Sequence, residues 1–233
     1  MTEVPAPAKL TVSLRITGVR DDGYHLIDAE MVSLDLADAL RFSDGDGLEV
    51  VGAAVAVDDR NLVRRALALV GRRAQVRLEK HIPPGAGLGG GSSDAAAVLR
   101  WAGVDDLSVA AQLGADVPFC LRGGRARVRG VGEVLEPLPF EARTLTLVLP
   151  PFGCSTVAVY RRWDELGGPT GPGVNDLEQA ALAVEPRLAE WRDRLGDATG
   201  ETPCLAGSGS TWFVAGEFPG EDRVVVRTTE GFG

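Results

Sequence analysis

The chain has 233 residues, of which 45% are hydrophobic and 24% are charged, as in soluble globular proteins of one or two domains. Its formal net charge of -9 excludes general binding to nucleic acid or to anionic membranes, because both need excess positive charge. A small anionic ligand is not excluded, since backbone amides and one or two cations suffice to bind a phosphate group.

Three cysteines, Cys120, Cys154 and Cys204, lie far apart in the sequence and form neither a CxxC motif nor a metal-binding spacing, so we expect reduced thiols. No apolar run approaches the roughly 20 residues that cross a bilayer. The first residues, MTEVPAPAKL, lack the apolar segment of a signal peptide. We therefore expect a cytoplasmic protein without nucleic-acid or membrane partners, either a monomer or a weak homodimer.

Alternating apolar and polar residues predict a strand over 9–17, and the Asp-Gly turn in VRDDGYH leads into a second strand over 25–35. Helical spacing predicts a helix over 61–72. Further strands are expected over 38–44, 48–57 and 74–82. The last of these strands leads into a glycine-rich loop and then a helix that runs to about Ala102, with Ser92 or Ser93 as its N-cap and Asp94 in its first turn.

The second half of the chain changes in composition near Pro150-Pro151. Before this point the patterns predict a short helix over 106–114, a hairpin over 126–138 and a strand over 144–150. After it they predict two or three helices, over 155–166, 175–184 and 186–196, and a glycine turn and strand within 205–216. We therefore predict two domains, 1–149 and 150–233.

Residues 85–91, GAGLGGG, stand between a strand and a helix N-terminus, which is the usual arrangement of an anion-binding loop. They are not a Walker A loop, which needs Lys and then Ser or Thr after the last glycine, whereas Ser92 follows here. GAGLGG matches the dinucleotide-binding pattern, but no acidic residue ends a second strand about 20 residues later. A glycine-rich loop without a ligand is the alternative.

In its longer context, PPGAGLGGGSSDAAA, this stretch resembles the phosphate loop of the GHMP kinases, such as galactokinase, homoserine kinase and mevalonate kinase. The resemblance covers nearly the whole chain and includes PAKL (7–10), DDGYH (21–25), RNLV (60–63), LGADVPF (113–119), GVGEVLEPL (130–138), STVAVY (155–160), NDLE (175–178) and LAGSGS (205–210). It implies a two-domain α+β fold, with a ribosomal protein S5 domain 2-like N-terminal domain, a ferredoxin-like α+β C-terminal domain and an active site between them.

The reaction that the resemblance implies is transfer of the γ-phosphoryl group of ATP to an alcohol. Asp116 in LGADVP then corresponds to the catalytic aspartate that takes or orients the hydroxyl proton, and Lys9 in PAKL is its partner cation. A lone aspartate is more often a helix or turn cap, and a lone lysine near the N-terminus is more often solvated. The paired motifs favour the catalytic interpretation of both.

The same resemblance places ATP on the glycine-rich loop, chiefly on backbone amides from Gly87 to Ser93, with Mg²⁺ as its counterion. The implied ATP-binding residues are Pro84, Gly85, Gly87, Leu88, Gly89, Gly90, Gly91, Ser92, Ser93, Asn61 and Lys80. It leaves open whether Ser92 or Ser93 contacts Mg²⁺. For Lys80, a surface residue at the end of a strand is an equally good interpretation.

Within the superfamily, DGYH and STVAVY most resemble kinases of the non-mevalonate isoprenoid route, which phosphorylate a cytidine diphosphate-linked polyol. The two tyrosines of the chain, Tyr24 and Tyr160, would then enclose the cytosine, with His25 bonded to it. A core position on an amphipathic helix is the alternative for Tyr160. The remaining implied substrate-binding residues are Thr11, Thr156, Gly207 and Gly209.

The sequence departs from this pattern at two positions. Thr11 follows PAKL where the family usually has asparagine, and Met31 stands where an aromatic residue is common. The chain is also shorter than usual members. Two other functions therefore stay open: another small-molecule GHMP kinase, or a catalytically silent homologue that binds nucleotides. The survival of Lys9 and Asp116 argues against loss of catalysis.

Overall fold

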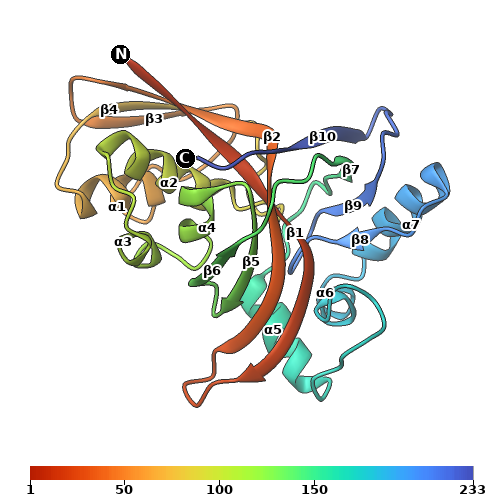
Figure 1. Ribbon diagram of the computed structural model, residues 1–233. Helices are drawn as coiled ribbons and strands as arrows, with labels where there is room; N and C mark the ends of the chain where they lie inside the picture. The colour runs from red at the N-terminus through yellow and green to blue at the C-terminus, as the bar shows by residue number, and fades with distance from the viewer. Residues whose placement is uncertain (233) are drawn as a thin grey trace.

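The computed structural model describes residues 1–232, in which helices cover one side of an extended mixed sheet (Figure 1). The strands are β1 (Thr2–Val19), β2 (His25–Ser43), β3 (Gly47–Val51), β4 (Gln75–Glu79), β5 (Arg125–Gly130), β6 (Val134–Pro137), β7 (Thr144–Val148), β8 (Cys204–Leu205), β9 (Trp212–Ala215) and β10 (Arg223–Thr229). The helices are α1 (Leu62–Leu69), α2 (Gly90–Ala102), α3 (Leu107–Ala111), α4 (Val117–Arg122), α5 (Thr156–Glu165), α6 (Glu178–Val184) and α7 (Leu188–Thr199). Within the described range, no helix has the length and apolar character that a membrane crossing requires.

The long antiparallel hairpin of β1 and β2 organises the molecule. Its turn lies between Val19 and His25, which pair with each other, and Gly23 has a positive φ of 86° there. The two strands predicted over 25–35 and 38–44 are one continuous strand, β2, because no glycine or proline interrupts DLADAL between them. The end of the hairpin that carries the turn points toward α5 (Figure 1).

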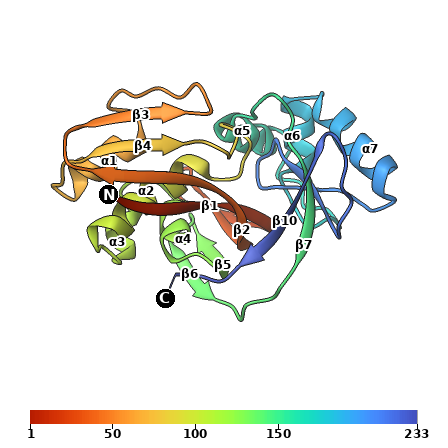
Figure 2. The ribbon, with the colours of Figure 1, turned by 90° about the horizontal axis from the view of Figure 1, so that it is seen from above.

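Strand β10 lies in the middle of the sheet and joins its two halves. The strand order is β3-β4-β2-β10-β7-β9-β8, with β1 and β5 also paired to β2, and β6 paired to β5. It pairs with β2 on one side and with β7 on the other, and Figure 2 shows it between the early and late parts of the chain. Strand β7 precedes residue 150 but pairs with β9 and β10. The division at residue 150 and the oligomeric state stay predictions.

Helix α2 packs against β1, α1 and α4. Its residues Ala95 to Leu99 are fully buried, and the small alanines let the helix lie close to the sheet. The predicted N-cap was wrong: α2 begins at Gly90, and its N-cap is Gly89 with φ 66°, so Asp94 lies beyond the first turn. The hydroxyl of Ser93 instead donates to the carbonyl of Pro7 at 2.6 Å.

One other prediction needs correction, and one helix was missed. The strand expected over 48–57 ends at Val51, because Gly52 turns the chain with φ 88° beside the carbonyl of Lys80. Helix α4 was not predicted as a helix, since its six residues are too few to show a periodic pattern. It begins directly after Asp116, with Pro118 in its first turn.

Candidate active site

The glycine-rich loop between β4 and α2 is shaped by left-handed backbone conformations. Gly85, Gly87 and Gly89 have φ angles of 76°, 79° and 66°, a region that other residues enter only with strain. At Gly87 a Cβ atom would overlap the carbonyl oxygen of Gly209, and at Gly89 it would approach Cγ of Lys9 to 2.6 Å. The glycines are therefore needed both for the turn of the loop and for its close contacts.

Thr211, which follows a second glycine turn, LAGSGS (205–210), holds this loop from the C-terminal part of the chain. The amide and hydroxyl of Thr211 both donate to the carbonyl of Ala86, at 3.2 and 2.7 Å. From the other side, the amide of Lys9 donates to the carbonyl of Leu88 at 3.0 Å. The loop is thus fixed by two segments remote in sequence, which limits its motion without consuming its own amides.

Lys9 and Asp116 meet beside the loop as the motifs implied. The Nζ atom of Lys9 lies 3.4 Å from Oδ2 of Asp116 and donates to Oγ1 of Thr11 at 3.2 Å. The lysine side chain is 8% exposed and the aspartate side chain 34% exposed, so the ammonium is buried while the carboxylate faces an open space. A carboxylate held this way can accept a proton from a ligand hydroxyl.

The glycine-rich loop separates two cavities, and Gly87 and Gly89 line both. The first has a volume of about 510 Å³ and is lined by Val55, Ala56, Arg60, Asn61, Leu62, Lys80, Asp94 and residues 82–91. The second has a volume of about 690 Å³ and contains Lys9, Asp116 and Ser92. A group bound to the loop in one cavity therefore lies next to the other, which is the arrangement that group transfer requires.

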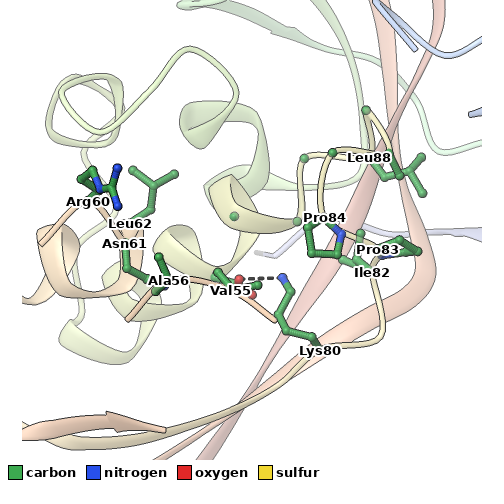
Figure 3. Close-up of a pocket in the computed structure, with 17 residues that line it drawn as sticks. Val55, Ala56, Arg60, Asn61, Leu62, Lys80, Ile82, Pro83, Pro84 and Leu88 are labelled. Carbon is green, nitrogen blue, oxygen red and sulfur yellow. Dashed lines mark hydrogen bonds and ion pairs between the residues drawn. The ribbon is translucent and has the colours of Figure 1, made fainter. Parts of the chain in front are cut away.

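Lys80 lies in the wall of the first cavity, which is shown in Figure 3. Two carboxylates neutralise the charge of its ammonium group. Nζ of Lys80 pairs with Oδ2 of Asp38 and, at 2.8 Å, with Oδ2 of Asp94. All three residues are buried, and burial raises the pKa of Asp94 to about 7 despite the opposing effect of Lys80. Asp38 also accepts from the amides of His81 and Ile82 at 2.6 and 2.8 Å, so it anchors the start of the loop.

Asn61 lines the same cavity as the N-cap of α1. Its Oδ1 accepts from the amide of Val63 at 2.9 Å, and its Nδ2 donates to the carbonyl of Ala56 at 2.8 Å. The side chain therefore fixes the helix start and the preceding loop. Apolar Ala56 and Leu62 stand near it, on the opposite side of the view from Pro83 and Pro84, and Val55 lies between Ala56 and Lys80 (Figure 3).

The second cavity carries the aromatic residues. Tyr24, on the hairpin turn, is 60% exposed, whereas Tyr160 on α5 is largely buried, which raises the pKa of its phenol to about 12. The ring of His25 lies 4.8 Å from that of Tyr160, centroid to centroid. Thr156 at the start of α5 shares a 2.8 Å hydrogen bond with Ser208.

The structure brings most of the sequence-predicted residues to one of the two cavities. Those on the first are Asn61, Lys80, Pro84, Gly85, Gly87, Leu88, Gly89, Gly90 and Gly91. Those on the second are Lys9, Thr11, Tyr24, His25, Gly87, Gly89, Ser92, Asp116, Thr156, Tyr160 and Gly207. Ser93 and Gly209 line neither cavity; Ser93 packs under the loop and Gly209 behind it.

Comparison with known proteins agrees with this geometry. Residues 60–124 match the GHMP kinases N terminal domain. A 4-diphosphocytidyl-2-C-methyl-D-erythritol kinase of Paracoccus denitrificans is 40% identical over 231 residues, which cover 89% of this chain and 84% of the relative. One of Ruegeria pomeroyi is 38% identical over 94% of this chain and 89% of its own. The chain belongs to the 4-diphosphocytidyl-2-C-methyl-D-erythritol kinases.

Solved structures agree with membership in this kinase family. A crystal structure of a 4-(cytidine 5'-diphospho)-2C-methyl-D-erythritol kinase superposes with a TM-score of 0.79 at 33% identity, over 100% of both chains. A homoserine kinase of Cytophaga hutchinsonii, with a TM-score of 0.61 at 18% identity over 99% of this chain and 96% of its own, shares the fold alone. The predicted α+β GHMP kinase fold is confirmed.

Sequence reasoning missed four polar residues that shape the site of this kinase. Asp38 and the role of Asp94 had no signal, because the partner of a buried carboxylate depends on tertiary packing. Asn175 belongs to the NDLE motif, to which no role was assigned. Asp164 had a usable signal, since it follows Tyr160 by four residues and so shares its helix face.

Proposed function

We propose that this chain transfers the γ-phosphoryl group of ATP to the 2-hydroxyl of 4-diphosphocytidyl-2-C-methyl-D-erythritol. The observation that carries the proposal is the glycine-rich loop, which forms the shared wall of two cavities beside the Lys9–Asp116 pair. Family membership supplies the identity of the two substrates. ATP occupies the first cavity. The alcohol occupies the second, which we call the acceptor cavity.

The triphosphate of ATP is bound mainly by backbone groups. Amides from Gly87 to Ser92 and the positive end of α2, which begins at Gly90, attract phosphate oxygens, whereas the amide of Ser93 donates to the carbonyl of Gly89 at 2.9 Å. Lys80 contributes little net charge, because Asp38 and Asp94 face its ammonium group. Its proposed role is to hold Asp94 and the loop start in place beneath the nucleotide.

The residues present fit a magnesium ion carried in by ATP. The described part of the chain holds no cluster of three His, Cys, Asp or Glu side chains that would bind a metal by itself, and Mg²⁺ commonly binds through phosphates, water and one or two protein oxygens. Of the two serines after the glycines, Ser92 lines the acceptor cavity, whereas the Ser93 hydroxyl donates to the carbonyl of Pro7. Mg²⁺ would neutralise phosphate charge, and the Ser92 hydroxyl would be available to hold it.

Asp116 accepts the proton of the substrate hydroxyl as its oxygen bonds to the γ-phosphorus. The bond from that phosphorus to the bridging oxygen breaks, and ADP leaves. Lys9 lies 3.4 Å from Asp116 and stabilises negative charge on the attacking oxygen. Thr11 and Gly207 line the cavity beside the pair and border the polyol.

The cytidine end of the substrate lies between the hairpin and α5. Tyr24 and Tyr160 offer ring faces to the cytosine, and His25 offers a polar group to its edge. Thr156 stands at the start of α5, where its hydroxyl and the helix N-terminus face the diphosphate and ribose. Gly209 supports this end only indirectly, through its contact with Gly87.

The test is ADP release with Mg-ATP and the cytidine diphosphate-linked alcohol. We expect substrate-dependent ADP from the wild type and a loss of roughly 100-fold or more in kcat for Asp116→Asn, the scale of general base catalysis. Asp105→Asn, the same change at an exposed position, serves as the control. Wild-type ADP release with homoserine or mevalonate instead would assign another GHMP kinase activity. ATP binding without turnover of any acceptor would favour a silent homologue.

A further inference from the structure

Helix α5 presents a carboxylate to the imidazole of His25 across the acceptor cavity. Nε2 of His25 lies 2.8 Å from Oδ1 of Asp164, although the two residues are 139 positions apart. Both residues line the cavity that contains Lys9 and Asp116. This contact joins the hairpin to α5 at the end of the cavity where Tyr24 and Tyr160 stand.

Three side chains of α5 fix the orientation of the imidazole. Besides the bond to Asp164, the His25 ring lies 4.8 Å from the Tyr160 ring at 43° and 5.5 Å from the Trp163 ring, edge-on at 83°. The histidine side chain is only 10% exposed. A ring held on several sides in this way does not turn over without breaking these contacts.

The bond to Asp164 also fixes which nitrogen carries hydrogen. An ionised carboxylate only accepts hydrogen bonds, so Nε2 of His25 must be the donor whether the ring is neutral or charged. Among the described residues Nδ1 of His25 has no hydrogen-bond partner. It is therefore the ring nitrogen left for a ligand.

We propose that Asp164 is a positioning residue that fixes the orientation and tautomer of His25 and thereby sets the preference of the acceptor cavity for cytosine over uracil. The inference rests on the proposed function, because it assumes that a cytidine diphosphate group occupies this cavity. Asp164 acts through His25 and need not touch the substrate.

Discrimination follows from the difference between the two bases. Cytosine carries an amino donor at C4, whereas uracil carries an oxygen acceptor there. In the neutral imidazole, with Nε2 donating to Asp164, Nδ1 is an acceptor, which suits the amino group of cytosine and not the C4 oxygen of uracil. An imidazole released from Asp164 can turn over or exchange tautomers and present a donor or an acceptor to either base.

The first test compares the cytidine diphosphate-linked and uridine diphosphate-linked alcohols in steady-state assays of Asp164→Ala and Asp164→Asn. For Asp164→Ala we expect KM of the cytidine substrate to rise roughly 5-fold, as for loss of about 1 kcal/mol. The KM of ATP should not change. In both variants the cytidine-over-uridine ratio of kcat/KM should fall. Alanine removes the partner of Nε2, whereas asparagine keeps the shape but can either donate to or accept from Nε2.

Asp193→Ala is the control, since Asp193 is also an exposed aspartate on a C-terminal helix, but it pairs with Arg192 and lies outside the acceptor cavity. A purely structural role of Asp164 would weaken both substrates alike and leave the ratio unchanged, which would overturn the inference. A destabilised variant would be recognised by its lower melting temperature and by an equal loss of apparent kcat with both substrates.

The second test needs no turnover and so separates this inference from the proposed function. The chain has two histidines, His25 and His81, so the spectrum of ¹⁵N-histidine-labelled protein is simple, and His81→Asn assigns it. We expect the Nε2-protonated form for His25 in the wild type and averaged tautomers in Asp164→Ala. Titration with CDP and UDP should show a preference for CDP that Asp164→Ala loses. If the wild type has that preference but no kinase activity, the proposed function fails and the inference stands. If Asp164→Ala keeps the preference, the inference fails.

Discussion

At the scale of single residues, the ammonium group of Lys9 is held between two oxygens. Thr11 accepts its hydrogen bond at 3.2 Å and Asp116 lies at 3.4 Å, so the hydroxyl of Thr11 aims the lysine at the proposed base. Thr11 is 2% exposed, and this bond is therefore shielded from water. The residue that departs from the family pattern thus still has a polar function in the site.

We predict that Thr11→Val lowers kcat roughly 5-fold, because it removes a hydrogen bond of about 1 kcal/mol that orients Lys9 while keeping the side-chain shape. The KM of ATP should stay unchanged, since Thr11 lines only the acceptor cavity. Thr11→Asn restores an acceptor oxygen and should recover most of kcat. Steady-state kinetics of both variants check the prediction, and a wild-type kcat in Thr11→Val would contradict it.

The residue scale also shows what the sequence could and could not predict. The pairing of Lys9 with Asp116 could be predicted, because each residue stands in a motif that the GHMP kinases share. The role of Asp38 could not be predicted, since it depends on hydrogen bonds with Lys80 and with the His81 and Ile82 amides, 42 to 44 positions away. Such buried polar clusters depend on how strands align, which local patterns do not encode.

At the scale of elements, strands and helices with clear periodicity were predicted well and the short or interrupted ones were not. The hairpin of β5 and β6, helix α1 and helix α5 agree with the sequence patterns. The start of α2 was placed at a serine because serine is a good N-cap, but Gly89 takes that position. Close approach of the Lys9 side chain to Gly89 leaves no room for a Cβ atom, and this constraint is tertiary.

The same element-scale packing gives a prediction for Gly87. In Gly87→Ala the residue would need a φ near 79°, and its Cβ would overlap the carbonyl oxygen of Gly209. We expect a loss of about 2 kcal/mol or more in the free energy of unfolding and a clear rise in the KM of ATP, because the loop must move. Urea unfolding and steady-state kinetics measure both.

Gly173→Ala is the matched control, because Gly173 has no positive φ and its Cβ would meet nothing within 4 Å. It should change the free energy of unfolding by less than about 0.5 kcal/mol. If Gly87→Ala were as stable and as active as this control, the loop would not need the contact with Gly209.

At the scale of the whole molecule, residues 174–176 connect the hairpin to the turn that supports the phosphate loop. The amide of Leu14 donates to the carbonyl of Val174 at 2.8 Å, and the amide of Asp176 donates to the carbonyl of Leu14 at 3.0 Å. Asn175 then donates from Nδ2 to the carbonyls of Leu205 and Gly207, at 2.8 and 2.7 Å. Since that turn packs on Gly87, the hairpin, the turn and the loop form one continuous support.

This connection predicts the effect of Asn175→Ala on both cavities. The change leaves the buried carbonyls of Leu205 and Gly207 without their donor, which should lower the free energy of unfolding by about 2–3 kcal/mol. Because the turn supports the wall that the two cavities share, we expect the KM values of ATP and of the alcohol to rise together. Gln112→Ala, which removes an exposed 3.5 Å hydrogen bond, is the control. Lower stability with both KM values unchanged would mean that the turn keeps its place without Asn175 and that the support runs through Thr211 alone.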